Sequence, residues 1–268
     1  MNKSLFNRTN LLLGDSTMTK IATTRVIIFG VGGVGSWCAE SLIRTGIREL
    51  TLVDSDRICV TNINRQVMAT TKTVGEVKVE ALKSRLLEIN PTANIQAIQE
   101  IYSKENASLF CMDDYDYVID AIDSLSNKIQ LLYVSSRSKA VVYSSMGAAL
   151  KMDATRVTVA EFWAVSGCPM AAWLRRKMRK ENLMPAKKIL CVYSPEVLEN
   201  KGYNTACGSA KCLCPKSITG QGKPELLNHE WCSLKARING TVAHTTAIFG
   251  FMLAGLVIED ICRACFPN

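Results

Sequence analysis

The sequence predicts an α/β fold with a mostly parallel sheet, helices on both faces, an antiparallel C-terminal extension and an apolar closing helix. Two observations predict it. Short apolar runs alternate with helix-period segments between residues 25 and 150, and a glycine-rich turn follows the first of these runs. Strands that alternate with helices are joined by right-handed crossovers, which place the helices on both faces of a parallel sheet.

The individual elements follow from their periodicity. Runs of apolar and β-branched residues predict buried strands at 25–30, 49–54, 94–99, 115–123 and 140–147. Segments with helical spacing predict helices at 34–46, 75–90 and 125–139. In the second of these helices, Val79, Leu82, Leu86 and Ile89 recur on one face, and Pro91 follows the expected end.

The rhythm changes after residue 150. We expect an antiparallel strand at 156–162, a basic helix at 171–183, a further strand at 188–195 and a Cys-rich surface loop at 199–230. The expected organisation is an N-terminal arm (1–24), a Rossmann-like nucleotide-binding core (25–150), and a segment 151–268 that belongs to the same domain.

Composition narrows the class of protein. Hydrophobic residues make up 48% of the 268 residues, which suits a globular chain with a sizeable core and excludes a disordered one. The net charge of +8 favours an anionic partner, or simply serves solubility. The N-terminal sequence has no secretory signal pattern, so a cytoplasmic protein is expected.

An apolar stretch at 238–258 contains no Asp, Glu, Lys or Arg and is long enough to span a bilayer. Thr, His, Asn and Gly interrupt it. We therefore expect a buried core helix or a dimer-interface helix and no membrane association.

The glycine-rich turn predicts nucleotide binding. Gly30, Gly32, Gly33 and Gly35 follow a strand and open a helix, where the backbone can approach phosphates and free N–H groups can bind them. Asp54 ends the next strand, 19 residues after Gly35, where a carboxylate can hold ribose hydroxyls. An NAD-dependent oxidoreductase is the first alternative.

Residues downstream of the turn favour ATP over NAD. Hydride transfer does not need several cations and a further carboxylate near the phosphates, whereas adenylation develops charge on the α-phosphate and on pyrophosphate, which cations and Mg²⁺ stabilise. The candidate site residues in this part of the chain are Asp56, Asn62, Arg65, Lys78, Asp123 and Ser124.

These motifs resemble the ubiquitin-activating-enzyme-like superfamily of adenylating enzymes (ThiF/MoeB type). The similarity runs in order through Phe6-Asn7-Arg8, Gly30–Gly35, Asp54-Ser55-Asp56, Asn62–Gln66, Lys78, Asn90-Pro91 and Asp123. The resemblance implies that Asp54 binds ribose, that Arg65 and Lys78 hold the phosphates, and that Asp123 coordinates Mg²⁺. It also implies a homodimer in which Arg8 reaches the neighbouring subunit's ATP. The alternatives are a solvated terminal charge for Arg8 and an exposed helix residue for Lys78.

Within this superfamily, the chain is similar to the tRNA threonylcarbamoyladenosine dehydratases. The shared segments are Gly33–Trp37, Val60–Gln66, Asp120–Ser124, Asp153–Val157, Cys191–Glu196 and Gly240–Gly255. The resemblance implies adenylation of the threonylcarbamoyl carboxylate at tRNA position 37, then cyclising dehydration with release of AMP and pyrophosphate. The basic segment 173–188 would suit tRNA phosphates, or be a solvated helix face. The alternatives are an adenylyltransferase for a ubiquitin-like sulfur carrier and a non-catalytic nucleotide-binding module.

Five cysteines bear on these alternatives. Sulfur-carrier adenylyltransferases often hold zinc with two cysteine pairs, and Cys212, Cys214, Cys262 and Cys265 lie in comparable places. The C-x-C spacing is irregular for such a site, so zinc is not expected. Cys232 is either a reactive thiol, which would fit a sulfur-transfer partner, or a structural cysteine.

Overall fold

The computed structural model describes residues 5–202 and 239–266. In this part of the chain, seven strands form one sheet in the order β3-β2-β1-β4-β5-β7-β6. All neighbours are parallel except β6 and β7, which pair antiparallel as expected. The strands are β1 (Arg25–Phe29), β2 (Glu49–Val53), β3 (Asn94–Ile98), β4 (Tyr117–Asp120), β5 (Val141–Ser145), β6 (Thr158–Glu161) and β7 (Leu190–Tyr193). The predicted fold class is thus confirmed.

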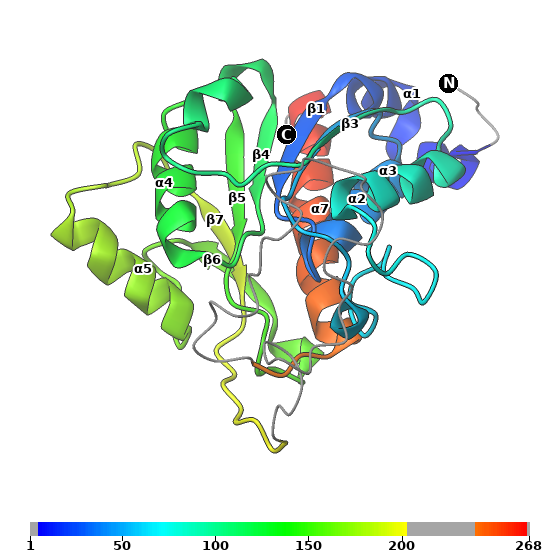
Figure 1. Cartoon of the computed structure of the whole chain (residues 1–268). Helices are drawn as coiled ribbons and strands as arrows, with labels where there is room; N and C mark the ends of the chain where they lie inside the picture. The colour runs from blue at the N-terminus through cyan, green and yellow to red at the C-terminus, as the bar shows by residue number, and fades with distance from the viewer. Residues whose placement is uncertain (1–4, 203–238, 267–268) are drawn as a thin grey trace.

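Helices cover both faces of this sheet (Figure 1). On one side lie α1, α2, α3 and α7, and on the other α4 and α5. Their bounds are α1 (Asn7–Thr23), α2 (Gly35–Thr45), α3 (Lys78–Ile89), α4 (Leu125–Ser135), α5 (Pro169–Lys180) and α7 (Ala243–Cys265). Four short 3₁₀ turns complete the described part: η1 (Val60–Asn62), η2 (Ala107–Phe110), η3 (Met112–Asp114) and η4 (Ala154–Arg156).

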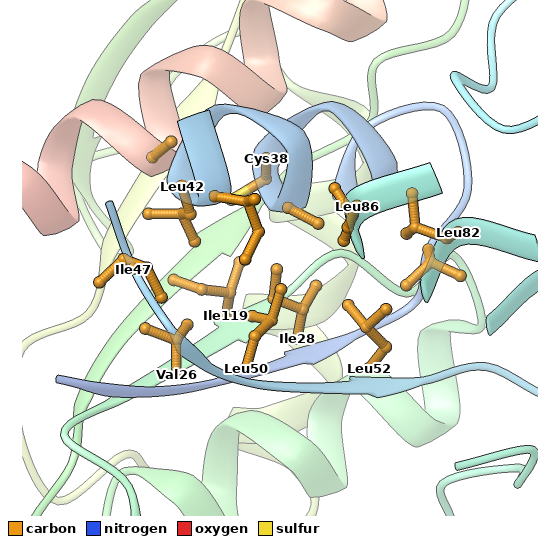
Figure 2. Close-up of a cluster of buried hydrophobic side chains, with 14 of the residues drawn as sticks. Val26, Ile28, Cys38, Leu42, Ile47, Leu50, Leu52, Leu82, Leu86 and Ile119 are labelled. Atoms are coloured by element: carbon orange, nitrogen blue, oxygen red, sulfur yellow. The ribbon is translucent and has the colours of Figure 1, made fainter. Parts of the chain in front are cut away.

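The larger core lies between the sheet and helices α2, α3 and α7. Figure 2 shows side chains of β1 and β2 pointing toward α2 and α3. Ile28 of β1 and Leu42 of α2 are among the residues labelled. Both are fully buried. Each large aliphatic side chain buried in this way contributes about 1.5–3 kcal/mol, so this layer holds the first βαβ unit rigidly and fixes the loops at its end.

Helix α7 packs on α2 at close range. A Cβ atom at Gly250 would lie 2.5 Å from the carbonyl oxygen of Val34, so only glycine allows this approach. In length and composition α7 could cross a membrane, and half of its most apolar stretch is buried in the protein. Its packing against α2 favours the expected core helix.

Three elements differ from the expectations. Helix α1 lies in the segment expected to be an arm, with a break at Gly14, whose φ is 78°. The strand predicted to reach residue 123 ends at Asp120, because the next residues turn toward α4. The basic helix begins two residues earlier than predicted, with Pro169 in its first turn, a position that tolerates proline. Most of the Cys-rich loop, from residue 203, lies outside the described residues.

Candidate nucleotide site

The site lies at the carboxyl ends of β1, β2 and β4. The chain passes from β1 outward to β2 and β3, then returns to β4 on the other side of β1. The point where strand order reverses in this way leaves a crevice in which open α/β sheets bind ligands. The segments that border this crevice are the glycine loop (residues 30–35), the residues after β2, and residues 121–124 after β4.

Two glycines of the loop are required by close contacts. Gly30 has φ +85°, and a Cβ there would lie 2.8 Å from the carbonyl oxygen of Ala121. A Cβ at Gly35 would lie 1.9 Å from the carbonyl oxygen of Gly30. At Gly32 the nearest atom would be the Gln66 amide nitrogen, at 3.8 Å. The loop is therefore tight against the protein at its ends and open at Gly32, where a phosphate could approach the backbone.

Asp54 is fixed just beyond β2. Its Oδ2 accepts the backbone N–H of Val31 at 2.8 Å, and its Oδ1 accepts that of Asp56 at 2.9 Å. One carboxylate thus ties the tip of β2 to the glycine loop. A carboxylate held by two backbone donors is rigid enough to select a ligand hydroxyl.

Lys78 is buried and is not an exposed helix residue. Its Nζ lies 2.6 Å from Oδ2 of Asp56 and 4.0 Å from Oδ1 of Asp54. Burial lowers the pKa of Lys78, but the charges of Asp54, Asp56 and Asp123 outweigh it and raise that pKa above its ordinary value. The side chain is therefore a fixed cation. Its backbone N–H donates to the carbonyl of Asp56 at 3.0 Å, which sets the start of α3 beside β2.

Arg65 lies against the glycine loop. A Cβ at Gly33 would be 3.2 Å from Cγ of Arg65, and the guanidinium donates to the carbonyl of Thr61 at 2.9 Å. The indole N–H of Trp37 donates to the Arg65 carbonyl at 2.9 Å, so the first helix of the core holds this segment in place. Asn62 is buried, and its side chain accepts the backbone N–H of Cys59 at 3.0 Å, which shapes the preceding turn.

Gln66 belongs to the site although it is absent from our candidate residues. Its Oε1 is buried without a hydrogen-bond partner in the described part of the chain. Its amide nitrogen is the nearest group to the open middle of the glycine loop. The sequence indicates Gln66 only by its position, because it directly follows Arg65 in the motif Asn62–Gln66.

Asp123 and Ser124 follow β4. Asp123 is exposed, and its charge contributes to the raised pKa of Lys78, which indicates that the two groups lie near each other. Ser124 is the residue before α4, and its side chain makes no capping hydrogen bond to that helix. Arg8 lies exposed on α1, and within the described residues no hydrogen bond or ion pair joins it to the other candidate residues.

These residues fit a nucleotide triphosphate. The glycine loop leaves space at Gly32, and the cations of Arg65 and Lys78 lie in the segments beside it, where a phosphate group would require positive charge. The described residues contain no group of three or more His, Cys, Asp or Glu side chains that could hold a metal. A protein needs only one or two carboxylates to hold Mg²⁺ beside phosphates, so a site of that kind would not form such a group.

The cysteine candidates divide between two regions. Cys262 and Cys265 lie on α7 as free thiols. Cys212, Cys214 and Cys232 lie outside the described residues.

Part of the basic segment 173–188 is engaged within the protein. Arg175 donates to the carbonyls of Phe162 and Val165 at 3.0 and 2.7 Å, and the Arg179 guanidinium lies 4.8 Å from the ring centroid of Trp163. Lys177 pairs with Glu181, and Lys187 donates to the carbonyl of Ser138. The remaining cations of the segment are exposed: Arg176, Lys180 and Lys188.

The chain belongs to the ThiF family, whose model matches residues 6–264. It is 38% identical over 259 residues to the tRNA threonylcarbamoyladenosine dehydratase of Bacillus subtilis, a match that covers 96% of this chain and 94% of that protein. The dehydratase of Escherichia coli is 33% identical over 261 residues, covering 96% and 92%.

A solved structure supports the same family assignment. The E. coli dehydratase in complex with ATP superposes with a TM-score of 0.80 at 28% identity, over 99% of this chain and 97% of that one.

The adenylyltransferase and sulfurtransferase MOCS3 of Drosophila willistoni is 32% identical over 158 residues, which are 58% of this chain and 33% of that protein. The full-length matches thus favour the dehydratases over the sulfur-carrier alternative.

Proposed function

We propose that this chain is an ATP-dependent tRNA threonylcarbamoyladenosine dehydratase. It adenylates the threonylcarbamoyl carboxylate of the modified adenosine and then cyclises the product, releasing AMP and pyrophosphate. The observation that carries the proposal is that the glycine loop is open at Gly32 while the buried cation of Lys78 carries a pKa raised in part by the charge of Asp123, at the end of the sheet where strand order reverses. The near full-length similarity to dehydratases gives the substrate class.

The first step makes a leaving group. A carboxylate oxygen of the substrate attacks the α-phosphorus, the bond to the β-phosphate oxygen breaks, and pyrophosphate leaves. In this proposal, Asp54 holds the ribose hydroxyls, while Arg65 and Lys78 stabilise the charge on the phosphates. Each role follows from where the residue lies relative to the glycine loop. Asn62 and Ser124 shape the walls, and the glycine-loop N–H groups bind phosphate oxygens.

The second step closes the ring. A nucleophile of the carbamoyl group attacks the activated acyl carbon, the bond to AMP breaks, and one proton is released. The tRNA nucleoside loses one water in total. Because both reacting groups belong to one substituent, the protein needs only to orient them and exclude water.

Mg²⁺ belongs to this proposal. Held by Asp123 and the phosphates, it would neutralise charge that develops on pyrophosphate. Asp56 is engaged by Lys78, so it serves to position that cation.

The remaining partners follow from the same proposal. The tRNA backbone binds the exposed cations of α5, and the substrate places the enzyme in the cytoplasm. A homodimer is supported by the apolar side chains of Leu11 and Leu12, which are 78% and 83% exposed on α1, three and four residues after Arg8. A sulfur-transfer protein remains a further candidate partner through Cys232.

The test offers the protein ATP together with either threonylcarbamoylated tRNA or a ubiquitin-like carrier. AMP formation and the mass of the acceptor are measured. Loss of one water from the tRNA nucleoside supports the proposal. Adenylation of the carrier's terminal glycine would instead establish the sulfur-carrier activity, and no AMP with either acceptor would leave only a binding module.

Two variants test the assigned residues. Arg65→Ala and Asp123→Ala should each slow AMP formation by about 10²–10³-fold, because each removes a charge that stabilises the transition state. Near-normal turnover in both would mean that the triphosphate lies elsewhere.

A further inference from the structure

A buried ion pair lies directly beneath the segment that carries Asp123. Nζ of Lys128, on α4, is 2.7 Å from Oδ2 of Asp120, the last residue of β4, and both side chains are fully buried. Neither can touch a ligand in the crevice. The mechanism above does not use them.

The pair holds both backbone groups of Ile122. Lys128 donates to the Ile122 carbonyl at 3.1 Å, and the Ile122 N–H donates to Oδ1 of Asp120 at 3.3 Å. The hydroxyl of Ser144, on β5, donates to Oδ2 of Asp120 at 2.6 Å. Side chains of β4 and α4 therefore hold the residue immediately before Asp123, and β5 in turn holds Asp120.

The same segment touches the glycine loop. The N–H of Ala121 donates to the carbonyl of Phe29 at 2.8 Å, and the Ala121 carbonyl lies where a side chain at Gly30 would be. A shift of residues 121–122 would thus move Asp123 relative to the phosphate cradle.

Stability alone does not explain this arrangement. Removing two charges from water costs several kcal/mol per ion, and a buried pair replaced by apolar residues often leaves a protein equally stable. The hydrogen bonds to Ile122 give the pair a different use, namely fixing a backbone segment.

We infer that Asp120 and Lys128 are positioning residues. They set the distance between the Asp123 carboxylate and the triphosphate, so that this carboxylate and the phosphates can bind the metal ion together. This inference rests on the proposed function. Outer groups that orient a metal ligand typically change metal affinity by about 10–100-fold when they are lost.

The test is direct metal binding to the full chain. Mn²⁺ serves as the probe, titrated by electron paramagnetic resonance in the presence of a non-hydrolysable ATP analogue. The variant is Asp120→Asn with Lys128→Met, which removes both charges and leaves neither one alone in the interior. Its matched control is Glu40→Gln with Arg85→Met, which removes a pair joined at 2.6 Å between α2 and α3.

The positioning role predicts Mn²⁺ binding weakened about tenfold or more in the first variant and unchanged in the control. Affinity for the analogue without metal should stay within about twofold in both. Wild-type Mn²⁺ affinity in the first variant, or equal losses in variant and control, would overturn the inference while the proposed function stood. If the wild-type chain bound no analogue, the proposed function would fail and the inference with it.

A second variant covers the case in which the first does not fold. Ser144→Ala keeps the ion pair and removes one hydrogen bond to Asp120. A smaller loss of Mn²⁺ affinity, about threefold, is expected. No change here, together with an unfolded double variant, would assign the pair to stability and overturn the inference.

Discussion

The ammonium group of Lys78 lies 2.6 Å from a carboxylate oxygen of Asp56 and 4.0 Å from one of Asp54. One buried cation therefore contacts two carboxylates just beyond β2 and neutralises one of their two negative charges. Without it, both negative charges would lie beside the proposed triphosphate, so the lysine reduces the repulsion that an anion would meet there.

Lys78→Met should reduce the rate of ATP–pyrophosphate exchange by about 10²-fold or more, because it removes the cation that we propose binds the phosphates and leaves Asp54 and Asp56 without it. Lys83→Met, on the same helix, is the control and should exchange at close to the wild-type rate. An exchange rate within twofold of wild type for the Lys78 variant would remove Lys78 from the site.

Gly35→Ala should destabilise the fold by about 3 kcal/mol, since a Cβ there overlaps the Gly30 carbonyl oxygen. Gly32→Ala meets only a side-chain amide at 3.8 Å, so its free energy of unfolding should stay near wild type while its ATP affinity falls. Urea unfolding and calorimetric titration separate the two effects. Equal stability of both variants would contradict the loop geometry.

Stability should depend on pH through Glu40. Burial raises the pKa of Glu40, but hydrogen bonds from Arg85 and Arg44 outweigh it and lower that pKa below the ordinary 4.5. A carboxyl group with a lowered pKa in the folded state contributes stability above its unfolded pKa, and this is lost as the pH falls through the folded value.

Glu40→Gln should therefore lower the free energy of unfolding by about 2 kcal/mol at pH 7. The gap between wild type and variant should narrow below pH 4.5 and should be measured by urea unfolding across pH 3–7. A gap that stays constant over this range would show that the ionised form of Glu40 is not what stabilises the fold.

Arg176→Glu with Lys180→Glu should weaken tRNA binding and reduce its dependence on salt, because two exposed cations of α5 are reversed. Filter binding at several salt concentrations measures both quantities. Lys187→Gln is the matched comparison, since that lysine is turned toward the Ser138 carbonyl. An unchanged salt slope in the α5 variant would move the tRNA surface to another face.

The strands and helices of the core were predictable because each buries one face of a regular period. Helix α1 was not, since Gly14 breaks it and Leu11 and Leu12 point to solvent. Its apolar pattern therefore gives no clear core-facing stripe. The end of β4 at Asp120 was not predictable from the sequence. Asp120 is buried there by its contacts with Lys128 and Ser144, and no local pattern reveals these contacts.

The candidate site was predictable at the level of which residues gather, since strand ends and glycine spacing place them. Their partners were not. That Lys78 is held by Asp56 depends on pairing between segments 56–58 and 75–78. Arg175 and Arg179 likewise contact residues of the turn after β6. The basic sequence of this helix therefore predicts more positive charge available to a partner than the structure leaves.

The contact between Gly250 and Val34 has a consequence for biosynthesis. Helix α7 supports the turn into α2, yet it is synthesised some 200 residues later. A nascent chain shorter than about 250 residues would expose the apolar face of α2 that α7 covers. The glycine loop therefore gains its support from the α2 side only when α7 is in place, so its final geometry depends on a contact between distant parts of the sequence.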